Sequence, residues 1–196
     1  MMRLSFSRLA QDRRGVTVIE FAIVAPVMIA LLMMLGDLLN RAYAQSLLEG
    51  AIQKAGRDST IQGGGDSTAA LDAKVVGSVK QIAKGLTWTS TRENFNSFSV
   101  IKPEVIEDKN GNGTLDPKEC FYDVNGNGTW DANPARSGQG AANDVTRYRI
   151  TISYPRLFPV MGFFGVASRQ EIKASTLLKN QPYARQVRTV VKVCLP

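Results

Sequence analysis

Histidine is absent from this 196-residue chain, and aromatic residues make up only 8% of it. Histidine is the commonest proton shuttle and the commonest metal ligand, so its absence disfavours many catalytic and transition-metal sites. Lysine and arginine exceed the acidic residues to give a formal net charge of +7. These basic residues are scattered and are not interleaved with aromatic ones, so we expect no binding of nucleic acid. Solubility or contact with anionic lipid explains the charge as well.

Cysteine is nearly absent. The two cysteines, Cys120 and Cys194, are far apart and do not form the CxxC pair of zinc or thioredoxin-like sites. A single structural disulfide between them needs an oxidising compartment, and two buried free thiols are the alternative. The pairing therefore depends on the topology of the chain.

One long apolar segment follows a basic N-terminal leader. Residues 16–35 form a nearly unbroken apolar run, interrupted chiefly by Thr17 and Glu20, and a run of about 20 residues can span a bilayer. The leader has one acidic residue, Asp12, and four basic ones, Arg3, Arg8, Arg13 and Arg14. Because positive charge is retained on the cytoplasmic side, we expect a cytoplasmic N-terminus and a periplasmic remainder.

Glu20 is the anomaly of the apolar run, because a charged side chain at mid-membrane costs about 2 to 3 kcal/mol. If the chain were cut between Gly15 and Val16, the new amine of Val16 would lie one helical turn from Glu20. That amine could neutralise the carboxylate in its own chain or in a neighbour's. A glutamate that snorkels to the interface is the alternative.

The sequence Arg-Arg-Gly-Val-Thr-Val-Ile-Glu-Phe-Ala at residues 13–22 resembles the type IV prepilin cleavage motif. In that motif a prepilin peptidase cuts after the glycine, and a glutamate stands fifth in the mature chain. Residue Val16, where type IV pilins usually have phenylalanine, is a departure that leaves N-methylation open.

Within that superfamily, the chain is similar to the TadE-like minor pilins, or pseudopilins, of tight-adherence pili. The similarity rests on the Glu20-Phe21 pair, on Pro26 and, more weakly, on the late Gln-Pro-Tyr at residues 181–183. The resemblance covers the first fifty or so residues well and the C-terminal third loosely. It implies a bacterial inner-membrane protein that is incorporated into a pilus, with other pilin subunits and the prepilin peptidase as partners.

Two other readings of the N-terminal segment stay open. Residues 42–44, Ala-Tyr-Ala, resemble a signal-peptidase site that would release a soluble protein starting at Gln45. The apolar run is longer than the usual apolar core of such a signal, and Glu20, Asp37 and Arg41 do not suit one. The second alternative is a membrane anchor that is never cut.

Beyond Asp37 the pattern becomes amphipathic and predicts that the helix continues to about Arg57. Its polar edge recurs every four residues at Arg41, Gln45, Glu49, Gln53 and Arg57, and its apolar edge contains Leu48, Ala51, Ile52 and Ala55. We expect this stalk to pack against the head, and we expect Pro26 to kink the membrane part. The chain then divides into a leader (1–15), a transmembrane helix (16–37), a stalk helix (38–62) and a head (66–196).

The head is expected to be α+β with a mostly antiparallel sheet. After a glycine run at 63–65, Asp66 or Ser67 can cap a second helix that Gly85 would end. Its apolar positions are Leu71, Val75, Val79, Ile82 and Leu86. Strand patterns cover residues 98–106, 145–154, 170–178 and 187–195, and the apolar loop 155–165 has no assigned role.

Residues 108–119 fit the calcium loop of about twelve residues at every defining position. Gly113 supplies the sharp turn, and Glu119 at the last position would supply two oxygens. The other predicted ligands are the side chains of Asp108, Asn110, Asn112 and Asp116 and the backbone carbonyl of Thr114.

Fifteen residues later, residues 123–131 repeat the first nine positions with the same spacing. The predicted ligands are Asp123, Asn125, Asn127, Thr129 and Asp131. The last position is Pro134, which has no ligating side chain, so the missing carboxylate must come from elsewhere, and Asp144 is our candidate. The loops nearly abut, so they resemble the compact tandem calcium loops of extracellular proteins more than sensor EF-hands.

The alternative without a bound ion is that both loops are Asx turns that merely reverse the chain. Two aligned copies favour Ca²⁺, and the asparagines and nearby lysines predict a weak dissociation constant, on the order of 10⁻⁴ to 10⁻³ M. An ion held so weakly suits a structural role better than a signalling one.

The sequence thus predicts a minor pilin or pseudopilin that takes part in assembly, initiation or capping of a tight-adherence pilus, with a calcium-stabilised head. The alternative is an uncut, membrane-anchored calcium-binding module that recognises a surface partner. A hydrolase that uses the acidic loops is the least favoured, since no set of nucleophile, base and oxyanion donors can be named. We therefore expect no catalytic activity.

Overall fold

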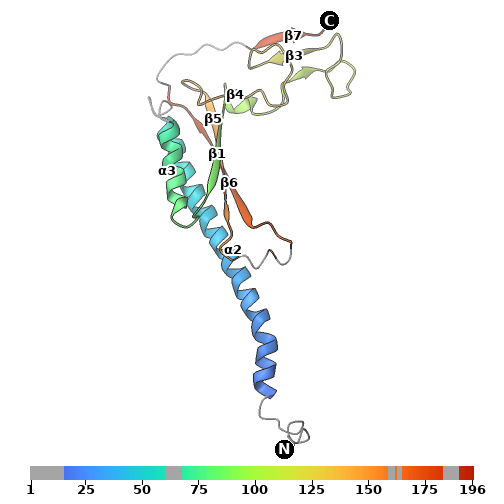
Figure 1. Ribbon diagram of the computed structural model, residues 1–196. Coiled ribbons are helices and arrows are strands. Elements are labelled where there is room, and N and C mark those ends of the chain that lie inside the picture. The colour runs from blue at the N-terminus through green and yellow to red at the C-terminus, as the bar shows by residue number, and fades with distance from the viewer. Residues whose placement is uncertain (1–15, 61–67, 159–161, 163–164, 183–189) are drawn as a thin grey trace, which may run out of the picture.

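The computed structural model describes residues 16–60, 68–158, 162, 165–182 and 190–196 (Figure 1). Several sequence predictions fall outside these ranges. They concern the leader with Gly15, the glycine run at 63–65, the two candidate helix caps, Tyr183 and the first residues of the last predicted strand.

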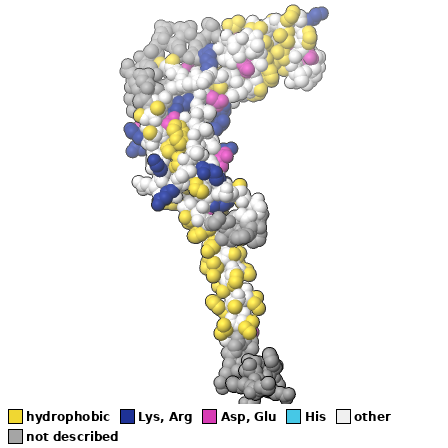
Figure 2. Space-filling model, viewed as in Figure 1, with side chains coloured by type: hydrophobic (Ala, Val, Ile, Leu, Met, Phe, Trp, Pro, Cys, Tyr) yellow, Lys and Arg dark blue, Asp and Glu magenta, His cyan; other side chains and the backbone are white. Residues whose placement is uncertain are grey.

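The first described helix, α2, covers Val16–Thr60 and continues through Pro26 as one element of 45 residues. Its N-terminal half extends away from the rest of the molecule (Figure 1). Within the described residues, it is the one helix long and apolar enough to cross a membrane. Figure 2 shows apolar side chains on the visible face of this half, and Phe21 is 70% exposed. A helix that is apolar all round needs an apolar environment outside the chain.

The C-terminal half of α2 packs on the head through one apolar stripe. Ala44, Leu48, Ile52 and Ala55 are buried there, at the four-residue and three-residue spacing that places them on one face. Gly56 lies where the helix comes nearest to the sheet, because a Cβ at this position would lie 2.2 Å from Cδ1 of Leu178. The predicted packing of the stalk against the head is therefore observed.

The second helix, α3, covers Thr68–Lys80 and lies beside α2 (Figure 1). It buries Leu71, Val75, Val76 and Val79 against the same core. The predicted end at Gly85 was wrong by five residues, because the Val79 carbonyl accepts from both Ile82 and Ala83 and the helix closes in a turn there. Gly85 instead takes a φ of +67°, in the turn that leads into the sheet.

The large sheet has four antiparallel strands in the order β4-β1-β5-β6. They are β1 (Thr87–Phe95), β4 (Arg136–Ser137), β5 (Val145–Pro155) and β6 (Arg169–Lys179). Alternate side chains of β5 and β6, among them Tyr148, Ile150, Ile152, Tyr154, Ile172 and Ala174, join the core with the two helices. The predicted α+β fold with a long N-terminal helix and antiparallel strands is confirmed.

A second sheet, at the end of the head away from the exposed half of α2, has the order β2-β3-β7 (Figure 1). Its strands are β2 (Ile106–Glu107), β3 (Cys120–Asp123) and β7 (Val191–Cys194), all antiparallel. Cys120 and Cys194 face each other on β3 and β7 and form a disulfide. Of the two states considered for the cysteines, the structure contains the bridge.

Two strand predictions were wrong. Residues 98–106 do not form a strand, because Phe98–Val100 is a 3₁₀ turn and only Ile106 belongs to β2. The strand β1 was missed because most of its side chains are polar and half or fully exposed, and only its last two residues are buried. The position of β1 in the large sheet is set by its antiparallel ladder with β5, in which Thr87 pairs with Ser153 and Phe95 with Val145.

Candidate functional site

The two acidic loops lie together in the outer part of the head. The first connects β2 to β3, and the second runs from the end of β3 toward β4. Both are at the end of the molecule away from the exposed apolar half of α2 (Figure 1). This part of the head consists of two long loops and three short strands, and it has little apolar core of its own. Its order therefore depends on hydrogen bonds and on the disulfide.

The first loop is organised around the carboxylate of Asp108. That carboxylate accepts hydrogen bonds from the backbone N–H groups of Gly111, Asn112 and Gly113. The N–H of Gly113 contributes most to holding the pKa of Asp108 below its usual range, and burial opposes it more weakly. Gly113 has a φ of +77°, the left-handed conformation that the sharp turn requires and that glycine adopts without strain.

The second loop repeats most of this arrangement. Asp123 accepts from the N–H groups of Gly126 and Gly128, and Gly128 has a φ of +79°. In each loop the two asparagine amides donate to the carboxylate at the ninth position, which is Asp116 in the first loop and Asp131 in the second. These four hydrogen bonds measure 2.6 to 2.8 Å. Equivalent sequence positions therefore have equivalent structural roles in the two loops.

The threonines also match. The N–H and hydroxyl groups of Thr114 donate to the side-chain oxygen of Asn112, and those of Thr129 donate to Asn127 in the same way. Within the described residues, no three His, Cys, Asp or Glu side chains are grouped closely enough to hold a metal ion by themselves. A cation would therefore need the amide oxygens of the asparagines and backbone carbonyls besides the carboxylates. Hard oxygen donors of this kind fit Ca²⁺.

Glu119 closes the first loop from its last position. Its two carboxylate oxygens accept from the N–H groups of Lys109 and Asp116, at 2.9 and 3.0 Å, and it is only 3% exposed. In the second loop, Pro134 stands at this position, as the sequence requires. Asp144, our candidate substitute, lies in another turn, where it accepts from the N–H of Ala141 at 2.8 Å. Burial raises the pKa of Asp144 there.

Glu104, which was not among the predicted ligands, is only 4% exposed and lies at the second loop. Its carboxylate oxygens accept from the N–H groups of Val124 and Asp131, at 2.8 and 3.0 Å. Glu104 precedes the second motif by 19 residues, so no spacing rule within the motif could find it. The only signal was an acidic residue within a predicted strand, residues 98–106.

The end of the head nearest the exposed apolar half of α2 has its own polar contact. Asp37 is 2% exposed on α2, and it accepts from Nη1 of Arg156 at 2.5 Å and from the N–H of Leu157 at 3.1 Å. The segment after β5 is thereby fixed to the helix where the apolar half of α2 ends. Glu20 lies further along the exposed apolar half, and Gly15, on the other side of the predicted cleavage point, is outside the described residues.

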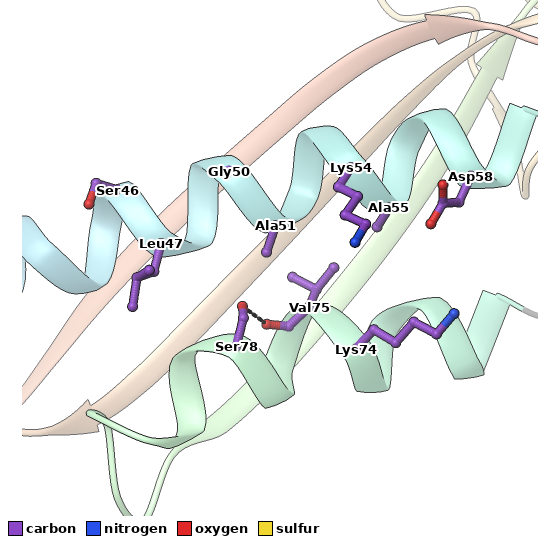
Figure 3. Close-up of a pocket in the computed structure, with 10 residues that line it drawn as sticks. All are labelled: Ser46, Leu47, Gly50, Ala51, Lys54, Ala55, Asp58, Lys74, Val75 and Ser78. Atoms are coloured by element: carbon purple, nitrogen blue, oxygen red, sulfur yellow. Dashed lines mark hydrogen bonds between the residues drawn. The ribbon is translucent and has the colours of Figure 1, made fainter.

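A groove of about 470 Å³ lies between α2 and α3 (Figure 3). Small apolar side chains of both helices line it, including Ala51, Ala55 and Val75, and Lys54 and Lys74 lie at its edge. The hydroxyl of Ser78 donates to the carbonyl of Val75, a bond within α3 itself. The groove follows the contact between the two packed helices.

Residues 15–57 match the family model described as TadE-like protein. The match covers the predicted cleavage point, the apolar half of α2 and most of its stalk half. The resemblance to TadE-like proteins inferred from the N-terminal motif is thus confirmed over this segment. Comparisons with curated proteins and with solved structures give no match.

Proposed function

We propose that this chain, whose residues 15–57 are TadE-like, is a minor pilin or pseudopilin of a tight-adherence pilus and acts in its assembly, initiation or capping. TadE-like pilins are structural proteins, and the role is accordingly one of assembly and not of catalysis. The observation that carries the proposal is the contrast between the halves of α2. One half is buried against the head, whereas the other presents apolar side chains such as Leu32, 63% exposed, on a helix of membrane-spanning length.

The exposed apolar half suits both lipid and neighbouring pilin helices. In the inner membrane it spans the bilayer, with the N-terminus in the cytoplasm and the head in the periplasm. After cleavage behind Gly15, the amine of Val16 neutralises Glu20 of the same or a neighbouring chain, which removes the cost of a bare carboxylate in an apolar bundle. Lateral association then exchanges lipid contacts for contacts between helices.

Site-specific photo-crosslinking in native membranes tests this role. A photoreactive residue at position 32 is expected to give adducts with other pilin subunits, because the side chain there lies on the exposed apolar half. The matched control is the same variant in cells without prepilin peptidase, where the protein adducts should disappear. Adducts with lipid alone in both strains would contradict the proposal and favour an uncut anchor that displays the head.

We also propose that Ca²⁺ stabilises the outer part of the head. The support is the repeated motif together with the matching backbone conformation and hydrogen bonds of the two loops. In each loop the aspartate carboxylates accept hydrogen bonds from amide N–H groups. A bound cation would replace some of these bonds with stronger ones and so stabilise the folded head. Each asparagine amide would turn to present its oxygen to the ion.

A calcium titration tests this part. Millimolar Ca²⁺ is expected to raise the midpoint of thermal unfolding of the full chain in detergent by a few degrees and to change the fluorescence of Trp130, and a chelator should reverse both. Trp130 reports on the site because it belongs to the second loop and its indole N–H donates to the carbonyl of Glu104 at 2.9 Å. Magnesium at the same ionic strength is the control. If both signals stay unchanged, the loops are Asx turns.

A further inference from the structure

We infer that Glu104, from outside the second motif, serves as that loop's missing last-position ligand and binds Ca²⁺ through both carboxylate oxygens. This inference rests on the calcium binding proposed above. It replaces Asp144 as the candidate and makes the second loop a complete site. Its counterpart is Glu119, which stands at the last position of the first motif.

The side chains of the two glutamates make the same contacts. Each carboxylate spans its loop, with one oxygen on the N–H of the second position and the other on the N–H of the ninth. For Glu119 these distances are 2.9 and 3.0 Å, and for Glu104 they are 2.8 and 3.0 Å. A carboxylate placed across the loop in this way can offer two oxygens to one ion, as the last-position glutamate of a calcium loop does.

The backbones match as well. The N–H of Glu119 donates to the carbonyl of Asp116 at 3.1 Å, and the N–H of Glu104 donates to the carbonyl of Asp131 at 3.0 Å. Both acceptors are ninth positions of their loops. Glu104 therefore approaches the second loop from the same direction as Glu119 approaches the first, although it is not connected to that loop through the same run of chain.

The pairing of β2 with β3 explains how this equivalence arises. Ile106 pairs with Phe121 and Glu107 with Cys120, and the N–H of Tyr122 donates to the carbonyl of Val105. Continued in both directions, this antiparallel register sets Glu119 opposite Asp108 and Glu104 opposite Asp123. Each loop thus begins with an aspartate that faces a glutamate across the same short ladder.

Burial supports a ligand role for both glutamates, which are 3% and 4% exposed although they are carboxylates. Buried carboxylates are rare unless they are paired or coordinate a metal. The partners of Glu104 described above are backbone N–H groups, which supply no formal positive charge. A divalent cation would supply that charge. Glu119 in the first loop is likewise a buried carboxylate that accepts from backbone N–H groups.

Terbium luminescence can test the second loop separately. Tb³⁺ substitutes for Ca²⁺ at oxygen sites, and excitation of Trp130 sensitises an ion bound in its own loop. In the full chain, Glu104→Gln is expected to lower the apparent affinity for Tb³⁺ by about tenfold or more, because a charge and a ligand oxygen are lost. The affinity is measured from the Trp130-sensitised luminescence. Glu119→Gln should leave that signal near the wild-type value and remove binding at the first loop, measured as total bound ⁴⁵Ca²⁺.

Two matched variants serve as controls. Asp144→Asn removes the rival candidate, and Glu107→Gln removes a neighbouring charge of β2 that contacts Lys192 and Tyr122 instead. Both should keep the wild-type signal. Glu104→Asp keeps the charge but shortens the side chain, so it should also weaken binding, and retention of the disulfide and of the near-ultraviolet circular dichroism shows that the variants are folded.

The outcomes separate the two proposals. Wild-type affinity in Glu104→Gln, or loss of affinity in Asp144→Asn, would overturn the role of Glu104 while calcium binding itself stands. If the wild-type chain binds neither Tb³⁺ nor Ca²⁺, both proposals fail, and Glu104 is then a structural cap of the loop. Neither result bears on the pilin role, which the crosslinking experiment tests.

Discussion

Asp37 and Arg156 form an ion pair of 2.5 Å that joins α2 to the segment after β5. Asp37 is buried, and the side chain of Arg156 is 15% exposed, so neither charge is well solvated. The pair lies where α2 changes from an exposed apolar rod to a packed stalk. The attachment of the segment after β5 to α2 therefore depends on a contact between residues far apart in the sequence.

Arg156→Ala should destabilise the head strongly, because it leaves Asp37 buried without its cation. The expected loss in the free energy of unfolding is about 3 kcal/mol, typical of removing one partner of a buried pair. Chemical denaturation of the full chain in detergent measures it. The control is Lys173→Gln, which breaks the exposed pair with Glu171 and should cost less than about 1 kcal/mol. Equal effects of the two substitutions would contradict the anchoring role of Asp37.

Asp72 should make the stability of the head depend on pH in acid. Burial alone would raise the pKa of Asp72, but hydrogen bonds from Arg92, Tyr148 and Ser90 outweigh it and lower the pKa below the usual 3.8. A lowered folded pKa contributes stability that is present above the unfolded pKa and is lost as pH falls through the folded pKa.

The measurement for Asp72 is the unfolding free energy of the full chain between pH 6 and about 2, compared with Asp72→Asn. The wild type should lose stability more steeply than the variant below about pH 4. Parallel curves would mean that the hydrogen bonds of α3 to the sheet through Asp72 do not favour its charged form. A steeper loss in the variant would contradict the assigned direction of the pKa shift.

Gly56 and Gly50 offer a paired test of helix packing within α2. A Cβ at position 56 would lie 2.2 Å from Leu178 and 2.9 Å from Thr176, whereas one at position 50 meets nothing within 4 Å. Gly56→Ala should therefore destabilise by about 1 to 3 kcal/mol through overpacking. Gly50→Ala should stabilise by up to about 1 kcal/mol, since alanine favours the helix. Thermal unfolding of both variants in detergent measures the difference. Stabilisation by both substitutions would show that α2 and β6 are not in close contact.

The disulfide should contribute substantially to the stability of the second sheet, β2-β3-β7. Cys120 and Cys194 are 74 residues apart, and removing a bridge of this kind from a small domain typically costs about 2 to 5 kcal/mol. Reduction with dithiothreitol should lower the unfolding midpoint of the wild type. The double variant Cys120→Ala/Cys194→Ala should start lower and not respond to the reductant. An unchanged midpoint in the reduced wild type would show that β3 and β7 hold together without the bridge.

Local patterns predicted the features that depend on neighbours in the chain. The apolar run predicted a long N-terminal helix, the amphipathic pattern beyond Asp37 predicted the half of it that packs on the head, and the repeated motif predicted two loops of the same kind. Features set by distant partners were not accessible in this way. The polar strand β1 is defined by its ladder with β5. Glu104 reaches the second loop only because β2 pairs with β3.

The measurement that tests the central claim most directly is the N-terminal sequence and intact mass of the mature protein, purified from its native membrane. We expect a chain that starts at Val16, since the leader, Gly15 and Glu20 then act together as in pilin processing and the TadE-like segment becomes the exposed end of the membrane helix. A chain that still starts at Met1, or that starts at Gln45, would contradict the pilin account. It would instead indicate an uncut anchor in the first case and a secreted head in the second.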